Sequence, residues 1–242
     1  MQVLSVLLLL LFSCSSKEAQ PVVTAEMKDD VKEVLDKAGK ALKVEKLKGV
    51  KSIVQKADLT IQNMGIKGKI TVTLKDDKIR IESQTAQMNE VQAYNGKDAW
   101  SENLAMGLRM LKGPEKLGLI AETIPFSFNP ERFYDKIELV GEVDFKGTKC
   151  FKIKSSKEGI DPVYEFVDVK TYMVKGEERI VPSPMGKMKT TTVYTKFTTH
   201  EKGFIYPSKM TQSMGPINME VTINDFKLDQ KVDDKIFQVP AQ

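Results

Sequence analysis

Apolar residues recur along this chain with two periods, one typical of a helix and one typical of strands. Between Glu26 and Val44 they return every three or four positions, with lysines and acids between them. This spacing predicts one helix with an apolar stripe that faces a core, and Thr24 is suited to cap its start. From Val50 onward the period changes to two, which predicts antiparallel strands with one face toward solvent.

Turn residues divide the region after Val50 into short strands. About ten strands follow, including a short one at Thr171–Val174, with turns roughly every 8 to 12 residues, a spacing typical of a barrel or a large sheet. No internal repeat or linker separates the two halves, so one domain is expected. The turns are expected at Asp76-Asp77, 95–98, 146–147, 157–159, 201–203 and Gly215.

One stretch, from Leu104 to Tyr134, interrupts the strand pattern. Three prolines punctuate it, and Pro114 is placed to open a helix that runs to about Thr123. The stretch is more apolar than a surface connection needs to be. It therefore predicts a helical segment that packs on the sheet.

The N-terminus carries an export pattern. From Val3 to Phe12 the chain is almost continuously apolar, a run about the size of a signal-peptide core and shorter than the ~20 residues that span a bilayer. The residues that follow, Leu11-Phe12-Ser13-Cys14, resemble the lipobox of bacterial lipoproteins. In that family the cysteine thiol is alkylated by a diacylglyceryl group and the signal is cut just before it. The alternative is an ordinary cleaved signal with a coincidental cysteine.

The lipobox divides the chain into three parts. We expect a lipoprotein signal peptide at 1–13, an acylated tether at 14–24 and the folded domain at 25–242. Two or three acyl chains on Cys14 anchor a protein to a membrane almost permanently, because each buried CH₂ contributes about 0.8 kcal/mol.

Composition excludes several classes of function. The chain carries 37 Lys and Arg against 33 Asp and Glu, a bias too weak to indicate nucleic-acid binding. One histidine, His200, and two cysteines cannot build a multi-His or Cys-rich metal site. No Ser-His-Asp set, phosphate loop or dinucleotide fingerprint is found, and Cys150 has no base beside it in the sequence. We expect no catalytic residues, no metal and no cofactor.

Several turn-rich motifs together carry a family resemblance. They are Tyr94–Trp100 in the first strand-rich half, and Gly203–Met210, Ile223–Asp229 and Val232–Pro240 toward the end of the second. In this arrangement the chain resembles the outer-membrane lipoprotein-sorting proteins, with their LolA-like and LolB-like fold, over most of residues 26–240. The resemblance implies a mainly β (α+β) fold, an open, strongly curved antiparallel half-barrel covered by helical segments. It also implies a hydrophobic cavity that takes acyl chains in the carriers.

Five side chains are candidates for lining such a cavity. Trp100 is the only tryptophan, and it belongs either to the core or to the mouth of the cavity. Met106, Met110, Phe126 and Phe128 lie in the apolar stretch, where methionine suits variable apolar ligands. Plain packing of a helix on the sheet is the alternative for these four.

The leading hypothesis for function is a non-enzymatic lipoprotein of the cell envelope that carries, accepts or senses acylated lipids or lipoproteins. Its expected place is the outer membrane, facing the periplasm and anchored through Cys14. The alternative is an interaction or regulatory subunit of an envelope complex, which binds a protein partner and has a packed interior. The two hypotheses differ in whether the space beneath the helices is empty or filled.

Overall fold

The strands that the alternating pattern predicts form one open, curved sheet. The computed structural model describes residues 26–27, 29–86, 89–183 and 186–241. The expected signal peptide, the lipidation of Cys14, the tether and the Thr24 cap lie outside these residues. The strand order is β1-β8-β9-β10-β11-β12-β13-β14-β2-β3-β4-β5-β6-β7.

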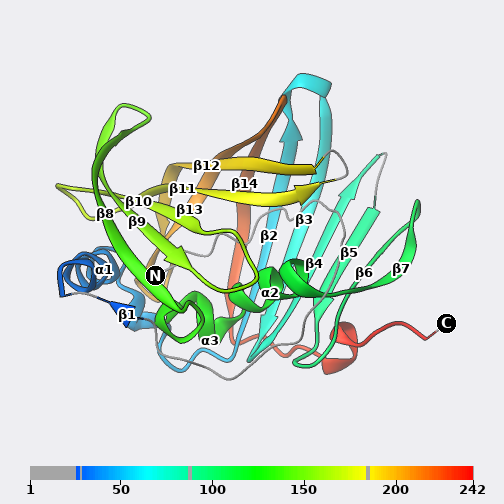
Figure 1. Ribbon diagram of the computed structural model, residues 1–242. Helices are drawn as coiled ribbons and strands as arrows, with labels where there is room; N and C mark the ends of the chain where they lie inside the picture. Colours follow the sequence, from blue (N-terminus) through cyan, green and yellow to red (C-terminus); the bar gives the residue numbers. More distant parts are fainter. Residues whose placement is uncertain (1–25, 28, 87–88, 184–185, 242) are drawn as a thin grey trace.

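Strands β2 to β14 pair antiparallel with one another, and two-residue β1 (Glu26–Met27) runs parallel to β8. Because β14 lies beside β2, the sheet joins two meanders, β8–β14 and β2–β7 (Figure 1). The bounds are β2 (Ser52–Ile61), β3 (Ile66–Lys75), β4 (Lys78–Thr85), β5 (Asn89–Tyr94), β6 (Ala99–Asn103), β7 (Gly107–Leu111), β8 (Lys136–Phe145), β9 (Thr148–Ser156), β10 (Val163–Asp168), β11 (Val174–Ser183), β12 (Gly186–Thr199), β13 (Ile205–Met214) and β14 (Ile217–Leu228).

The expectation of an open antiparallel sheet is confirmed, but the sheet has more strands than the predicted ten. One missed strand is β7, which lies in the stretch that the sequence assigned to a helical cover. The strand expected at Thr171–Val174 is instead β11, which begins at Val174 and continues to Ser183. Charged side chains occupy alternate positions of β11, so this strand lacks the alternating apolar pattern that predicts a strand. It nevertheless pairs with β10 and β12 inside the sheet.

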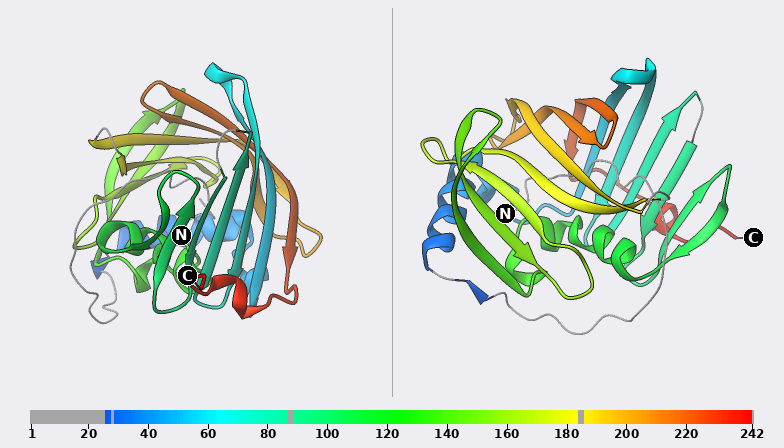
Figure 2. Two further views of the ribbon diagram at one scale, coloured as in Figure 1. Left: turned by 90° about the vertical axis from the view of Figure 1, so that its right-hand side faces the viewer. Right: turned by 45° about the horizontal axis from the view of Figure 1, so that its top comes forward.

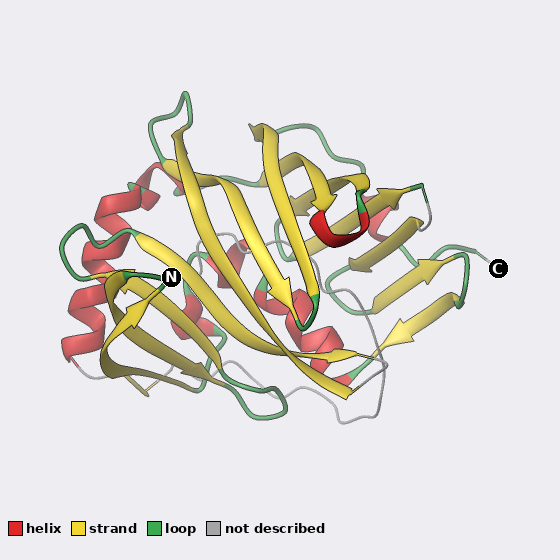
Figure 3. Cartoon of the chain, turned by 90° about the horizontal axis from the view of Figure 1, so that it is seen from above, coloured by secondary structure: helices red, strands yellow, loops and turns green. Residues whose placement is uncertain are grey.

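The α-helices lie against the concave side of the sheet, around which the strands curve (Figures 2 and 3). We call the face of the sheet toward the α-helices the inner face and the opposite face the outer face. The helices are α1 (Asp29–Leu42), α2 (Gly113–Ala121) and α3 (Ile124–Ser127), with short 3-10 turns η1 (Val44–Leu47), η2 (Gln62–Met64), η3 (Pro130–Arg132) and η4 (Asp234–Phe237).

Helix α1 confirms the predicted amphipathic helix. It lies against β8 and β13, and its Lys37 Nζ donates a hydrogen bond of 3.2 Å to the hydroxyl of Tyr172 in the β10–β11 turn. This helix therefore closes one end of the inner face with its apolar stripe. The stripe is buried and consists of Val31, Val34, Ala38 and Leu42.

Helix α2 confirms the helix predicted to open at Pro114. The proline lies in the first turn, where its missing N–H removes no helical hydrogen bond. The helix lies against β4, β5 and β6, and Leu119 on its inner side is fully buried.

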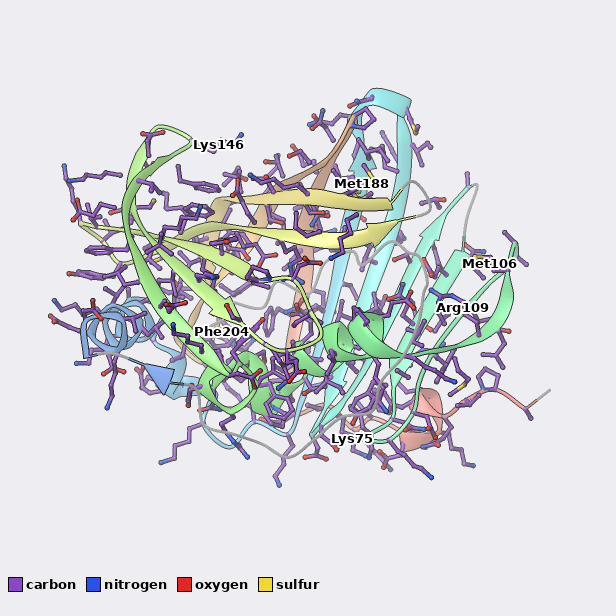
Figure 4. The ribbon with its side chains drawn as sticks, viewed as in Figure 1. Lys75, Met106, Arg109, Lys146, Met188 and Phe204 are labelled. Atoms are coloured by element: carbon purple, nitrogen blue, oxygen red, sulfur yellow. The ribbon has the colours of Figure 1, made fainter. Side chains whose placement is uncertain are left out.

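The C-terminal segment packs on the outer face of β3–β6. The indole Nε1 of Trp100 donates a hydrogen bond of 2.9 Å to the carbonyl of Phe237, and the side chain of Phe237 is itself fully buried. Arg80 donates to the carbonyl of Ile236 at 2.7 Å. At the edge of this contact, Lys75 (Figure 4) forms a 2.7 Å ion pair with Asp234. Trp100 is therefore a core residue beneath η4.

A second, smaller apolar cluster lies on the outer face of β8–β11. The rings of Phe145 and Phe166 stack with centroids 3.9 Å apart, and Cys150 is fully buried beside them. Burial raises the pKa of the Cys150 thiol to about 11, so the thiol stays protonated at neutral pH. Cys150 has the environment of a packing residue, as expected from the sequence.

Replacing Trp100 with Phe tests the attachment of the C-terminal segment. The phenyl ring keeps much of the packing, but the carbonyl of Phe237 loses its donor, so we expect the free energy of unfolding to fall by about 1–2 kcal/mol. Urea denaturation measures this change. Met110→Leu, on the exposed neighbour of Trp100 in β7, is the control and should stay within about 0.5 kcal/mol of the wild type. Equal stability of Trp100→Phe and wild type would contradict this role.

Candidate functional site

The two short helices α2 and α3, which we call the helical cover, lie on the inner face and are tied to it at both ends of α2. Near the start of α2, Glu115 accepts two hydrogen bonds from Arg109 of β7, at 3.0 and 2.7 Å. Just after its end, Glu122 accepts from both terminal nitrogens of Arg179 of β11, at 3.1 and 3.2 Å. Figure 4 places Arg109 on the β6–β7 side of α2. Two strands far apart in the sheet therefore hold one helix.

The first tie lies among polar side chains of β5 and β6. Glu90 is buried, and burial raises its pKa to about 7 although Gln92 donates a hydrogen bond to it at 3.2 Å. Ser101, which lies opposite Arg109 on the neighbouring strand, is also fully buried. The inner face is therefore not uniformly apolar beneath α2.

The second tie belongs to a buried charged cluster, which we call the Arg179 patch: Glu122, Glu165, Glu177 and Arg179. Arg179 forms an ion pair of 2.8 Å with Glu177, two positions away on the same strand, in addition to its bonds with Glu122. Glu165 of β10 lies directly opposite Glu177. Like charges in directly opposed positions destabilise a sheet, so this pair is an unusual feature of the inner face.

The charge states of the Arg179 patch follow from its burial. Burial raises the pKa of both Glu122 and Glu165 to about 7, although Arg179 acts in the opposite direction on each of them. Burial alone would lower the pKa of Arg179, but Glu177 and Glu122 raise it well above its ordinary value. Arg179 is therefore charged at neutral pH, while Glu122 and Glu165 titrate near it.

Neutral polar groups surround the patch. Thr190 lies opposite Arg179 on β12, and Thr192 lies opposite Glu177. Both are buried, and the hydroxyl of Thr190 has no hydrogen-bond partner among the described residues. Tyr134, which follows η3, is also buried, and burial raises the pKa of its hydroxyl. The patch and its surroundings thus gather carboxyl groups, hydroxyl groups and one guanidinium in one buried region.

The helical cover presents apolar side chains beside these polar groups. Phe126 packs against Phe133 with ring centroids 5.5 Å apart, and Phe133 meets Tyr134 edge to face at 5.0 Å. The following side chains are half-buried against the core: Leu117, Ile120, Ile124, Phe126 and Phe128. Two of the five sequence candidates, Phe126 and Phe128, therefore lie in or beside the cover.

The other three candidates lie elsewhere. Trp100 and Met110 are opposed on β6 and β7, on the outer face with the C-terminal segment. Met106 lies in the β6–β7 turn at the end of that hairpin (Figure 4), and it is 43% exposed. The structure does not bring these three together with Phe126 and Phe128. A period of two predicts that Trp100 and Ala99 point to opposite faces of the sheet. It does not predict which of the two faces the helices cover.

The sequence interpretation missed the Arg179 patch entirely. In β10 the inner-facing positions are Val163, Glu165 and Val167, so an acid stands where the alternation calls for an apolar residue. That replacement is the one local signal that could have indicated a buried charge. The partners come from β11 and from the end of α2, and no local pattern joins them.

Among the described residues, no group of three or more His, Cys, Asp or Glu side chains is arranged to hold a metal ion. Within the same part of the chain, no helix has the length and apolar character needed to cross a membrane.

Comparison with solved structures identifies the fold. A DUF1329 family protein from Desulfovibrio piger matches 87% of this chain and 98% of its own, with a TM-score of 0.56 and 13% identity. A lipoprotein-sorting domain from Vibrio parahaemolyticus, described as putative, matches 85% and 96%, with a TM-score of 0.54 and 12% identity. A LolA superfamily protein from Nitrosomonas europaea matches 86% and 96%, with a TM-score of 0.56 and 14% identity.

The chain thus has a LolA-like fold, and the resemblance seen in its sequence motifs is confirmed at the level of fold. Neither a protein-family model nor a curated protein matches the sequence.

The raised pKa of Glu165 predicts how stability depends on pH. An acid whose pKa rises on folding, here from 4.5 to about 7, stabilises the fold below its unfolded pKa. This contribution is lost as pH rises through about 7. We expect the thermal midpoint of Glu165→Gln to fall less than that of the wild type between about pH 5 and pH 8, by roughly a few degrees.

Differential scanning calorimetry across this pH range measures the difference. Glu178→Gln, one position from Glu177 and paired with Lys189 rather than Arg179, is the matched control and should keep the wild-type slope. Parallel slopes for wild type and Glu165→Gln would show that Glu165 is not the titrating group.

Proposed function

We propose that this protein is a non-enzymatic lipid-binding protein of the cell envelope, which takes up acyl chains between the inner face and the helical cover. The observation that carries the proposal is the cover itself. It is a pair of short helices with half-buried apolar side chains, held on the concave side of an open sheet by ion pairs at the two ends of α2.

The way the cover is held supports a role in uptake. The Arg109–Glu115 pair is partly exposed, with 16% and 14% of the side chains accessible, so water can replace it when α2 moves. The strands beneath pair with one another through their own ladders, to which the cover contributes no strand. A shift of the cover would therefore break side-chain contacts and leave the strand pairing in place.

The apolar part of the inner face supplies the surface for an acyl chain. Ile53, Leu74 and Ile79 form one fully buried row across β2, β3 and β4. An acyl chain gains about 25 cal/mol for each Å² of apolar surface removed from water, so it needs no directed bond to bind. The names of two structural neighbours, a lipoprotein-sorting domain and a LolA superfamily protein, support a carrier class for the fold.

The N-terminal sequence supports the location. The apolar run before Cys14 and the lipobox-like residues favour export, acylation of Cys14 and anchoring at the outer membrane, facing the periplasm. The chain would then act as a carrier, acceptor or sensor of acylated lipids or lipoproteins. An interaction subunit with a filled interior is the outcome that the second test below would favour if no lipid binds.

Changing Cys14 to Ala tests the anchor. Without the thiol no diacylglyceryl group can be attached, so the protein should move from the membrane fraction to the soluble fraction after cell lysis and centrifugation. Cys150→Ala removes the other cysteine and should leave the protein in the membrane fraction. A Cys14→Ala protein that stays with the membrane would overturn the lipoprotein assignment.

Lipid uptake is tested with the Cys14→Ala protein, purified without detergent and titrated with a fluorescent fatty acid. We expect saturable binding, and Phe126→Ala combined with Phe128→Ala should weaken it about tenfold or more, because two large apolar contacts are removed. Met110→Ala, on the outer face, should bind as the wild type does. Absence of saturable binding, together with a lipid-free mass in native mass spectrometry, would favour the filled interaction module.

A further inference from the structure

We propose that the end of α1 and the 3-10 turn η1 that follows it form a docking surface for an anionic phospholipid membrane. The surface consists of four exposed lysines, which we call the Lys40 patch: Lys40, Lys43, Lys46 and Lys48. The proposal goes beyond lipid uptake, because it concerns the side of the domain that meets the membrane. It does not depend on what lies beneath the helical cover.

The excess positive charge of the chain is concentrated in this segment. The whole chain has a formal net charge of +4. Residues 40–51 contain five lysines and a single acid, Glu45, so they carry the same net charge as the whole chain, and the remaining residues balance one another. Clusters of four or more basic residues on an amphipathic helix are typical of segments that bind anionic lipids.

The lysines of the patch are not neutralised by the fold. None of the four forms an ion pair within the described residues, whereas Lys37, one turn earlier in α1, pairs with Glu33 at 2.7 Å. The acids nearest to the patch in the sequence, Asp36 and Glu45, are exposed and pair with none of its lysines. The four ammonium groups can therefore meet an external anion.

The fold holds the four lysines together at the surface. Helix α1 ends at Leu42, and tight turns continue the chain through backbone hydrogen bonds of 3.1 Å from Lys43 N to Lys40 O and from Lys46 N to Lys43 O. Leu42 and Leu47 are both buried. Because these two leucines point into the core, the lysines between and beside them lie at the surface of the domain.

Local stability does not account for this set of lysines. A lysine in the last turn favours the helix dipole, which explains Lys40, but Lys46 and Lys48 lie beyond α1. Lys43 has a φ of 55°, in the left-handed region where the end of a helix favours glycine. A position where the backbone favours glycine thus carries a charge, which supports a role for the ammonium group.

The place of the patch suits a domain anchored through its N-terminus, and in this respect the inference rests on the proposed function. About 12 residues separate Cys14 from β1 and can span at most about 40 Å. Helix α1, with 14 residues, is about 21 Å long. The tether is therefore long enough for α1 to lie along the membrane with the patch against it. Since α1 closes one end of the inner face (Figure 1), this orientation brings that end to the lipid.

The test measures vesicle binding by the Cys14→Ala protein expressed without residues 1–13. Neither acyl chains nor the apolar N-terminal run can then hold it on a membrane, and every described residue is retained. In co-sedimentation at low salt, we expect about tenfold or more tighter binding to phosphatidylcholine vesicles with about 30% phosphatidylglycerol than to pure phosphatidylcholine. At about 0.5 M salt the preference should be lost, because salt screens exposed charges.

Replacing all four lysines of the patch with Gln should reduce the affinity for the anionic vesicles about tenfold or more. The matched control replaces four exposed lysines of β2, β3 and β12 with Gln and has the same net charge. It should stay within about threefold of the parent protein, because charges farther than a Debye length from the lipid are screened. The control positions are Lys56, Lys67, Lys69 and Lys196.

Lys43→Gly removes one charge without strain on the backbone. Glycine suits the left-handed conformation, so the thermal midpoint should stay close to that of the parent protein. The affinity for anionic vesicles should fall about threefold to fivefold, because one of four charges is lost.

Three results would each overturn the docking surface. They are equal binding to the two kinds of vesicle, an equal loss in the patch and control variants, and unchanged vesicle affinity of Lys43→Gly. Lipid uptake would stand in all three cases, because the fatty-acid titration uses no vesicles and no variant of the patch. Conversely, a protein that binds anionic vesicles through the patch but takes up no fatty acid would retain the docking surface and lose the proposed function.

Discussion

The structure depends on one buried arginine. Arg179 holds Glu122 at the end of α2 and Glu177 on its own strand, so it joins the helical cover to the middle of the sheet. A buried charge that loses its partner is strongly destabilising, whereas the same pair kept together contributes little net stability. The arginine therefore fixes where the cover lies more than it stabilises the fold. The apolar rows of β2–β4 and the stripe of α1 provide the stability.

The two faces of the sheet differ in the contacts that their side chains make. On the outer face, Trp100 and Phe237 close β3–β6 with an indole hydrogen bond and buried rings, and the stacked pair Phe145 and Phe166 closes the other half. Charged side chains also take part on this face, because Arg80 donates to the carbonyl of Ile236 and Lys75 pairs with Asp234. The inner face carries the short helices and the buried carboxyl groups whose pKa is raised to about 7, Glu90, Glu122 and Glu165. A change in the charge of these carboxyl groups therefore acts on the face that the cover occupies.

Much of this fold is predictable from the sequence because each predicted element has a one-sided apolar pattern. Helix α1 and the hairpin of β3 and β4 follow from periods of 3.6 and 2, and α2 follows from Pro114. The full extent of β11 is not predictable from the sequence pattern, because Glu177 and Arg179 occupy its inner positions. The face to which Trp100 points is not predictable either. A strand pattern defines two faces, but it does not indicate which of them a distant C-terminal segment covers.

The same reasoning explains how chains with 12–14% identity to this one share its fold. An open antiparallel sheet requires only that apolar residues occupy every second position along each strand, and many sequences satisfy that condition. Departures from that condition are inner, buried positions that carry a charged residue. In this chain those positions are Glu165, Glu177 and Arg179, and they meet only because β10 and β11 are neighbours and α2 ends above them. These three side chains and Glu122, which lies just after α2, are therefore the feature of the inner face that the alternating pattern of a strand cannot predict.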